Sequence, residues 1–361
     1  MRAEAGVPHT SGVTPPAALA VVADQVTALL DGVLADEVHR WSALDPDLAA
    51  PVGALRRLVL TGGKRLRPAF CHWSFVGAGG NPDDPRILDT AAAFELLQVF
   101  ALIHDDVMDA SPTRRGTPTI HTEFADRHRA AGWRGDARHF GEGVAILVGD
   151  VAHVYADRLM TGAPPAALDI WHELRIEVNI GQYLDLAGTV RGTTDLETAR
   201  RISRYKSGKY TIERPLHMGA ALRGRLDDLR PVLDAYGVPL GEAFQLRDDL
   251  LGVFGETEVT GKPIGEDLRE GKPTPLLAIA TELADDRQRE VLARVGSPEL
   301  DPADISVLQE VIEATGARGR IEEQVRGLTA RAAAALDRSP LTAEATEALC
   351  ELASFVGERD S

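Results

Sequence analysis

The chain has 361 residues, of which 44% are hydrophobic and 26% are charged, and its formal net charge is −16. This is the composition of an ordinary globular protein, large enough for one big helical core. The negative charge excludes nucleic acid or an anionic membrane surface as the main partner. The two cysteines, Cys71 and Cys350, lie far apart in apolar surroundings, so we expect free thiols in a reducing compartment.

The N-terminal residues lack the charged and then apolar pattern of a signal peptide. No apolar run approaches the roughly 20 residues that a membrane span requires. We therefore expect a cytoplasmic protein without a membrane span.

The chain is expected to form one all-α domain over residues 16–361, preceded by a loose tail over residues 1–15, which show no hydrophobic periodicity. Strand-like alternation is scarce, and Ala, Leu, Glu and Arg predominate, which predicts twelve or thirteen helices. Long connections are expected at 111–141, 188–195 and 256–271, where functional loops are common. The predicted helices cover residues 17–43, 48–60, 67–78, 84–109, 143–161, 165–187, 195–205, 209–222, 226–255, 273–293, 302–315, 318–336 and 342–356.

The predicted helix 84–109 is apolar until it ends in the acidic sequence Asp105-Asp106-Val107-Met108-Asp109. Asp105 and Asp109 share one helix face, where two like charges at the C-terminal end destabilise a bare helix. A divalent cation would reverse both penalties, and Mg²⁺ suits such a site because it combines one or two carboxylates with water and phosphate oxygens. Asp106, turned about 100° away, is expected to be an outer-shell residue or the partner of a lysine. A solvated acidic helix end is the alternative.

A second acidic cluster contains Gln245, Asp248 and Asp249, which stand at i, i+3 and i+4 and share a helix face. A glycine-containing segment with lysines follows it, as basic residues follow the first cluster. Two such sites are hard to attribute to chance, and they predict metal ligands from both clusters: Asp105, Asp109, Asp248 and Asp249.

Basic residues gather near these clusters. The segment Gly62–Arg67 (GGKRLR) places three cations after two glycines that let the backbone approach an anion, and arginine offers a two-point fork to phosphate. Taken singly, such residues are typical of a solvated surface. Taken together with the acidic clusters, they indicate two diphosphates, one bound through metal and one by cations alone. The other basic residues of this set are Arg114, Arg115, Lys206, Lys262 and Lys272.

With these motifs the chain resembles the trans-isoprenyl diphosphate synthases (polyprenyl synthetases), which are head-to-tail prenyltransferases. Six motifs occur in the family's order between about Val52 and Ala278: GGKRLRP, ELLQ with HDDVMD, SPTRRG, KSGKYT, FQLRDD and TGKPIGEDLREGK. The resemblance implies the isoprenoid synthase fold, a single all-α bundle around a deep central cavity, and a homodimer.

The resemblance also implies the ligands of each residue. Mg²⁺, as three ions with the allylic diphosphate, would be bound by the four aspartates named above. An allylic diphosphate (dimethylallyl, geranyl or farnesyl) would be held by Arg114, Lys206, Ser207, Gln245, Lys262 and Lys272. Isopentenyl diphosphate would be held without metal by Lys64, Arg67, Gln98 and Arg115.

The implied reaction is ionisation, condensation and elimination. Metal and cations stabilise the departing diphosphate, a cavity shielded from water protects the allylic carbocation, and the alkene of isopentenyl diphosphate attacks it. A proton then leaves to the released diphosphate. The catalytic residues implied are Asp105, Asp109, Asp248, Lys206 and Lys262.

The second acidic cluster departs from the family pattern, which commonly has a third aspartate four residues after the first. Gly252 stands at that position. Either Glu256 or Asp267 is expected to compensate for the missing carboxylate.

Product length depends in this family on bulk before the first acidic motif. Ala101 lies one turn before Asp105 on the same helix face and leaves the pocket open, while Phe94 is a candidate floor or a plain core residue. Phe100 lies about 140° around the helix from Asp105, so Ala101 carries more weight. A small residue with one aromatic beside it favours geranylgeranyl diphosphate (C20) over farnesyl diphosphate (C15).

Two other functions remain open at this stage. A class I terpene cyclase also uses an aspartate-rich motif with Mg²⁺, but it needs only one diphosphate site and would leave GGKRLRP, Gln98 and the paired arginines without a purpose. A non-catalytic subunit of a heteromeric synthase typically loses its acidic clusters. The first cluster is complete here, and only Gly252 favours that alternative.

Overall fold

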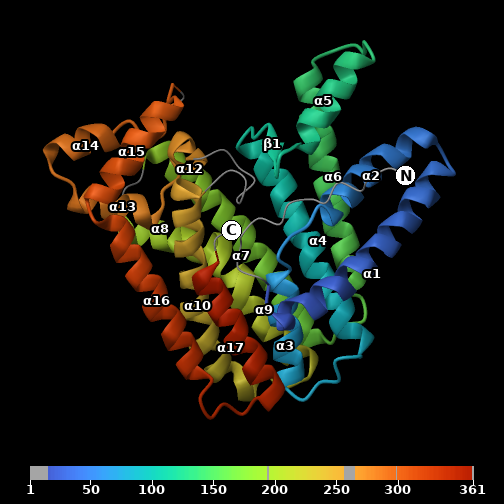
Figure 1. The fold of residues 1–361 in the computed structure, drawn as a ribbon. Helices are drawn as coiled ribbons and strands as arrows, with labels where there is room; N and C mark the ends of the chain where they lie inside the picture. Colours follow the sequence, from blue (N-terminus) through green and yellow to red (C-terminus); the bar gives the residue numbers. More distant parts are fainter. Residues whose placement is uncertain (1–14, 193–194, 256–264, 298, 360–361) are drawn as a thin grey trace, which may run out of the picture.

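The structure is a computed structural model that describes residues 15–192, 195–255, 265–297 and 299–359 (Figure 1). The described residues are helical apart from turns, loops and one antiparallel hairpin of β1 (Thr113–Arg114) and β2 (Thr117–Pro118). The all-α prediction is therefore confirmed. The helices are α1 (Ala17–Ser42), the 3₁₀-helix η1 (Pro46–Leu48), α2 (Ala49–Leu60), α3 (Leu66–Gly77), α4 (Pro85–Met108), α5 (Ile120–Ala130), α6 (Ala137–Leu159), α7 (Pro165–Arg191), α8 (Leu196–Ser203), the π-helix η2 (Arg204–Glu213), α9 (Arg214–Leu222), α10 (Leu226–Phe254), α12 (Glu266–Glu270), α13 (Pro275–Leu283), α14 (Asp286–Leu292), α15 (Pro302–Ala314), α16 (Ala317–Ala335) and α17 (Ala343–Glu358).

The chain has more helices than the twelve or thirteen predicted. Two helices lie in segments expected to be loops, namely α5 within 111–141 and the short α12 within 256–271. The predicted helix 273–293 is two helices, because Asp285 begins a new helix with a capping box in which its side chain and that of Gln288 satisfy each other's backbone N–H groups. The tail predicted over residues 1–15 falls almost entirely outside the described residues, and the division into a tail and one domain stays a prediction.

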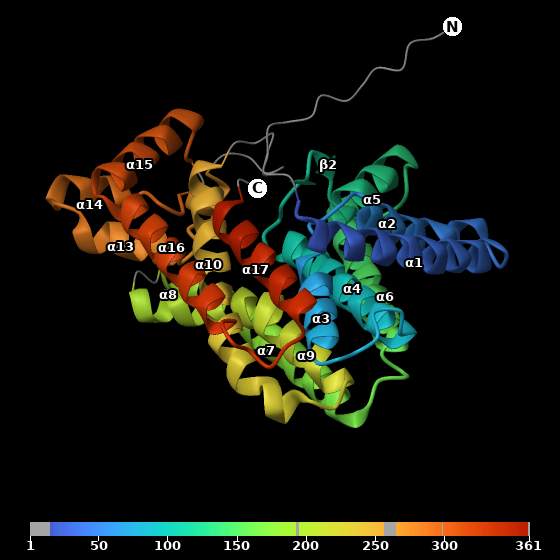
Figure 2. The same ribbon diagram turned by 60° about the horizontal axis from the view of Figure 1, so that its bottom comes forward.

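The bundle has two sides joined by central helices. In both views α1, α2, α4 and α6 lie on one side, α10, α13 and α16 lie on the other, and α7 and α9 lie between them (Figure 1; Figure 2). Three hydrophobic clusters match this arrangement, one centred on α4, one on α3, α9 and α17, and one on α13, α15 and α16. Helix α10 contributes to the second and third clusters, so it connects them.

Helix α4 carries the first acidic cluster into the centre of the bundle. Asp84 caps its first turn by accepting a hydrogen bond from the backbone N–H of Arg86 at 2.9 Å. Its side chains are buried from Thr90 to Phe100, apart from the half-buried Gln98, and Asp109 is the residue that ends it. The predicted core helix with carboxylates at its C-terminal end is therefore confirmed.

Two helices, α1 and α4, are long and apolar enough to cross a membrane by length and composition alone, contrary to the expectation that the chain contains no such segment. Of the most apolar window, 67% is buried inside the bundle in α4 and 33% in α1. The core helix of a globular protein meets the same criterion, and the burial of α4 against α6 and α3 accounts for its composition.

Candidate active site

Asp105 is the point at which three elements meet. Its Oδ1 accepts hydrogen bonds from Nε2 of Gln182 on α7 at 2.9 Å and from Nζ of Lys206 on η2 at 3.2 Å. Burial alone would raise the pKa of Asp105, but the positive charges of Lys206, Lys272 and Arg114 lower it well below its ordinary value. Asp105 is therefore an ionised carboxylate in a buried and strongly positive environment.

Close approach of backbones places Lys206 at this point. A Cβ atom at Gly181 would lie 2.4 Å from the backbone nitrogen of Lys206, so only glycine allows α7 to contact η2 here. The π-helix, a conformation common at functional sites, directs the Lys206 ammonium to Asp185 at 2.6 Å as well as to Asp105. Sequence reasoning identified Lys206 but missed its α7 partners, Gln182 and Asp185.

Asp109 contacts the region after the second acidic cluster. Its Oδ2 lies 3.2 Å from Nζ of Lys272, which also pairs with Glu270 at 2.5 Å. Burial and the negative charge of Asp105 raise the pKa of Asp109. The negative charges of Asp267 and Asp109 more than offset burial and raise the pKa of Lys272 well above its ordinary value. The structure thus joins the two segments that sequence analysis placed in one site.

Asp106 is buried and pairs with an arginine. It is 3% exposed, and its Oδ1 accepts hydrogen bonds from Nε and Nη2 of Arg114 at 2.8 and 2.6 Å. The structure thus pairs Asp106 with an arginine, and its role as an outer-shell residue stays a prediction. Arg114, expected to hold the allylic diphosphate, is paired with this carboxylate in the structure.

The two aspartates of the second cluster point to different neighbours. Asp249 is 2% exposed and accepts a hydrogen bond from Nε2 of Gln245 at 2.8 Å. Its Oδ2 has no hydrogen-bond partner among the described residues. Burial, followed by the negative charges of Asp267 and Asp248, raises the pKa of Asp249 well above its ordinary value. Asp248 instead pairs with Arg359, so Gln245 hydrogen-bonds to only one of the two carboxylates that it was expected to flank.

The donor set fits Mg²⁺ by its chemistry. Within the described ranges, no three His, Cys, Asp or Glu side chains are grouped closely enough to enclose a metal ion. Mg²⁺ does not require such a cage, because it binds one or two carboxylates and keeps water or phosphate oxygens in its other positions. Oδ2 of Asp249 is buried and has no hydrogen-bond partner among the described residues. Burial and then their neighbours' negative charge raise the pKa of both Asp109 and Asp249, which indicates that positive charge is in deficit here.

A cationic cluster lies beside Asp248. Burial and the positive charges of Arg359, Arg115 and Arg247 lower the pKa of Lys64 to about 8, although Asp248 acts in the opposite direction. Arg359 donates a hydrogen bond to the carbonyl of Phe244 at 3.0 Å, and Arg247 donates one to the carbonyl of Arg359 at 2.7 Å. Lys64 and Arg115 were predicted for an anion site. Arg247 and Arg359 were missed, although Arg247 stands inside the second acidic motif.

The polyprenyl synthetase family model matches residues 52–315 of the chain. The chain belongs to the polyprenyl synthetase family. It is 32% identical over 329 residues to the geranylfarnesyl diphosphate synthase of Aeropyrum pernix, covering 88% of this chain and 96% of that protein. It is 31% identical over 282 residues to the geranylgeranyl diphosphate synthase of Sulfolobus acidocaldarius, covering 75% of this chain and 79% of that protein.

The fold agrees with this membership. The structure is similar to that of a geranylgeranyl pyrophosphate synthase from Corynebacterium glutamicum complexed with isoprenyl diphosphate and magnesium. The TM-score is 0.85 at 39% identity, and the match covers 93% of this chain and 99% of that chain. This polyprenyl synthetase therefore has the isoprenoid synthase fold, and it is a trans-prenyltransferase, an isoprenyl diphosphate synthase.

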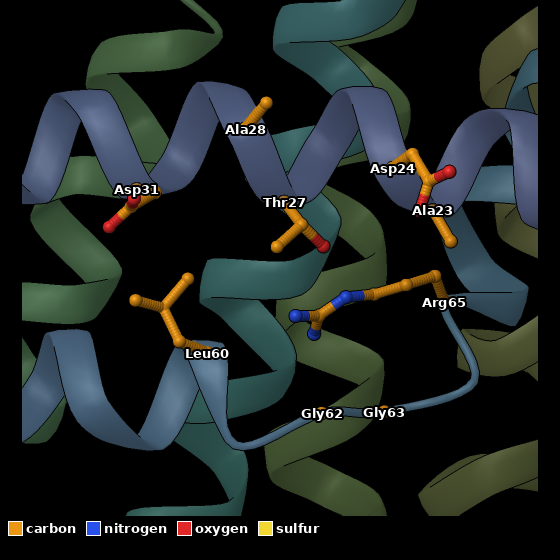
Figure 3. Close-up of a pocket in the computed structure, with 9 residues that line it drawn as sticks. All are labelled: Ala23, Asp24, Thr27, Ala28, Asp31, Leu60, Gly62, Gly63 and Arg65. Carbon is orange, nitrogen blue, oxygen red and sulfur yellow. The ribbon is translucent and has the colours of Figure 1, made fainter. Parts of the chain in front are cut away.

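The loop after α2 is anchored to the synthetase by Arg65, which adopts a left-handed backbone conformation with φ 52°. Its guanidinium pairs with the buried Glu95 of α4 and donates to the carbonyl of Val59 at 2.6 Å. A cavity of about 420 Å³ lies between this loop and α1, lined by Arg65, Gly62 and Gly63 with Asp24 and other α1 residues (Figure 3). The aspartates of the two acidic clusters do not line it.

The other predicted diphosphate residues occupy several elements. Arg67 donates to Oγ1 of Thr211 at 2.8 Å and lies 4.2 Å from the ring centroid of Tyr210. Arg115 donates to the carbonyl of Gly62, which brings Arg115 to the loop that contains Gly62 and Lys64. Gln98 is partly buried on α4, and Ser207 is partly buried on η2. Lys262 and Glu256 lie outside the described residues.

The candidate length-determining residues of this synthetase have different surroundings. Phe94 is fully buried with its ring centroid 5.7 Å from that of Trp171, as expected of a core residue. Phe100 stacks on His153 of α6, with ring centroids 4.7 Å apart, whereas Asp105 contacts α7 and η2. Ala101 is only partly buried against the core. The helical-wheel argument that separated Phe100 from Asp105 agrees with these contacts.

Proposed function

We propose that this synthetase uses Mg²⁺ to condense isopentenyl diphosphate with an allylic diphosphate. The observation that carries the proposal is the pair of lysine bridges at the first acidic motif, Lys206 to Asp105 and Lys272 to Asp109, at 3.2 Å each. Both lysines come from segments across the bundle from α4, so cations and carboxylates converge on one place. The magnesium-bound Corynebacterium relative supports the choice of metal.

The ligands of Mg²⁺ in this proposal are Asp105 and Asp109 from α4 and Asp248 and Asp249 from α10, with three ions accompanying the allylic diphosphate. When bound, the ions supply charge neutralisation for the leaving diphosphate. Lys206 and Lys272 add fixed positive charge at the same place, where burial strengthens electrostatic stabilisation. Arg114, Ser207, Gln245 and Lys262 complete the allylic diphosphate site.

The isopentenyl diphosphate site in this proposal is the cationic cluster of Lys64 and Arg115 with Arg67 and Gln98. This substrate keeps its diphosphate, so binding by cations is sufficient and no metal is required. Burial, and then repulsion by Arg359 and Arg115, lowers the pKa of Lys64. An arriving diphosphate would relieve that repulsion, which is the physical argument for an anion site here.

The proposed product is geranylgeranyl diphosphate, with farnesyl diphosphate as the alternative. Ala101 is small and lies one turn before Asp105, while Phe100 is directed to α6. Relatives at similar identity are named geranylgeranyl and geranylfarnesyl diphosphate synthases, so their names support a chain of at least 20 carbons over a C15 product.

The proposed assembly is a homodimer. Exposed apolar side chains recur at helical spacing on α7, where Ile176, Ile180, Tyr183 and Val190 lie on one face, and on α6, where Leu147 and Val154 do so. Exposed apolar surface of this extent is typical of an interaction site. A two-fold axis would bring the same surface of a second copy against it.

The test is incubation of the purified protein with Mg²⁺, isopentenyl diphosphate and each allylic primer, followed by mass analysis of the dephosphorylated products. Elongation to C20 supports the proposal, and a C15 end product contradicts the length. A hydrocarbon formed without isopentenyl diphosphate would indicate a cyclase. Absence of elongation with every primer would indicate a non-catalytic subunit and overturn the proposed function.

A further inference from the structure

Helix α10 lacks a side chain at the third position of its acidic motif, Gly252. A Cβ atom at Gly252 would lie 1.9 Å from Oδ2 of Asp267 and 2.7 Å from its Cγ. The carboxylate of Asp267, which belongs to α12, therefore occupies the space that any side chain at position 252 would need. The missing side chain of Gly252 thus leaves the space in which the Asp267 carboxylate lies.

Local structure fixes Asp267 and connects it to the first acidic motif. The backbone N–H of Lys272 donates to the carbonyl of Asp267 at 3.1 Å, and Gly271, with φ 68°, makes the turn that permits this bond. Nζ of Lys272 lies 4.0 Å from Oδ1 of Asp267 and 3.2 Å from Oδ2 of Asp109. Asp267 thus lies between the α10 motif and the lysine that bridges to α4.

Asp249 provides an independent observation. It is 2% exposed, and its Oδ2 has no hydrogen-bond partner in the part of the chain that the structure describes. A buried carboxylate oxygen without a hydrogen-bond partner is costly unless a proton or a cation lies beside it.

We propose that Asp267 supplies the carboxylate that the second acidic motif lacks at Gly252, and that it strengthens the binding of divalent cation by this synthetase. This inference rests on the proposed Mg²⁺-dependent function. It adds Asp267, a residue of α12, to the acidic motif of α10. Asp267 is a positioning residue in this role. It holds Lys272 toward Asp109 and supplies negative charge beside Asp249.

The experiment compares Asp267→Asn, Gly252→Asp and the exchange variant Gly252→Asp/Asp267→Gly with the wild-type protein. Asp286→Asn is the matched control, because Asp286 is a fully exposed carboxylate that pairs with Arg289 one turn along the same helix, α14. Two readouts are measured for each protein: the rise in unfolding temperature on titration of Mg²⁺ with inorganic diphosphate, and the Mg²⁺ concentration for half-maximal elongation.

Asp267→Asn keeps the shape of the side chain and removes its charge, so both readouts should shift to Mg²⁺ concentrations about 10- to 100-fold higher, the range for residues that support metal ligands. Gly252→Asp alone should lower the unfolding temperature without metal, because its Cβ overlaps Asp267. The exchange variant restores one carboxylate in the same space. Its Mg²⁺ response should be closer to wild type than that of either single variant.

Two results would overturn the inference while leaving the proposed function intact. One is an Asp267→Asn response to Mg²⁺ equal to that of Asp286→Asn, with or without a lower unfolding temperature. The other is an exchange variant whose Mg²⁺ response is as poor as the sum of the two single changes. A wild-type protein that elongates no primer would instead overturn the proposed function, and the unfolding titration would still report on Asp267.

Discussion

Arg114 hydrogen-bonds to Asp106: its Nε and Nη2 lie 2.8 and 2.6 Å from Oδ1 of Asp106, and both side chains are largely buried. Asp105, the adjacent residue, lies at least 3.9 Å from the same guanidinium and pairs with Lys206 instead. Neighbouring aspartates of one motif therefore have separate tasks. Asp106 fixes the loop after α4, and Asp105 faces the lysines.

The two aspartates should respond oppositely to truncation. Asp106→Ala leaves a buried arginine without its partner, which should lower the free energy of unfolding by about 3–5 kcal/mol. Asp105→Ala leaves Lys206 paired with Asp185, so stability should change less, while elongation should fall by about 100-fold or more because charge stabilisation at the leaving group is lost. Denaturant unfolding and steady-state rates measure the two effects.

Asn variants at both positions serve as controls that keep side-chain volume. Equal losses of activity in Asp105→Ala and Asp106→Ala, at equal stability, would show that the two carboxylates share one role.

The first acidic motif was predictable because local sequence determines it. In a chain that folds as one helical bundle, a long apolar run forms a core helix, and aspartates at its end then lie inside the bundle. Helix α5 was missed because its buried residues, Ile120, Phe124, Ala125 and His128, form one narrow stripe in a largely polar segment. Their spacing of four, five and eight residues from Ile120 is nevertheless helical, and it was the available signal.

Other parts of the site depend on tertiary contacts that no local pattern reveals. Arg359 reaches Asp248 only because α17 returns to the end of α10. Asp185 joins Lys206 only because Gly181 allows close contact between α7 and η2. The suggestion that Asp267 replaces an absent carboxylate rested on proximity in sequence, and the overlap with Gly252 supplies its physical basis.

The charge of Lys64 should make binding of isopentenyl diphosphate depend on pH. Its pKa is lowered to about 8, so the ammonium is present below that pH and is lost above it. The KM for isopentenyl diphosphate should therefore rise as pH increases through about 8. Lys64→Arg stays charged and should flatten this profile, and Arg359→Ala, which removes a repulsive charge, should move the rise to higher pH.

The lowered pKa of Lys64 also makes the stability of the fold depend on pH. Stability should rise with pH, whereas binding of isopentenyl diphosphate should weaken. The pKa of Lys64 is about 8 in the folded chain against an ordinary value of 10.5, so the unfolded chain binds more protons between these values. The contribution of Lys64 to the free energy of unfolding should thus increase as pH rises across this window. A Lys64→Arg profile parallel to that of the wild type, in KM and in stability, would contradict both expectations.

Product length should respond to Ala101 rather than Phe100. Ala101→Phe adds a ring one turn from Asp105, so the main product should shorten to C15. Phe100→Ala removes a ring that stacks on His153, 4.7 Å away on α6, and should leave the product length unchanged. Mass analysis of the dephosphorylated products decides which of the two residues limits product length. A longer product from Phe100→Ala alone would assign that role to Phe100.

The proposed dimer surface can be tested without touching the site. Val154 is 59% exposed and Ile176 is 58% exposed, so glutamate at both positions should cost the monomer little stability. Within a dimer these changes would bury like charges against each other across a two-fold axis. Sedimentation velocity should therefore show a dimer for the wild type and a monomer for Val154→Glu/Ile176→Glu.

Val307→Glu, on α15 and 43% exposed, is the control and should remain dimeric. A double variant that sediments like the wild type would place the interface elsewhere, because two buried charges on each copy could not be accommodated in it.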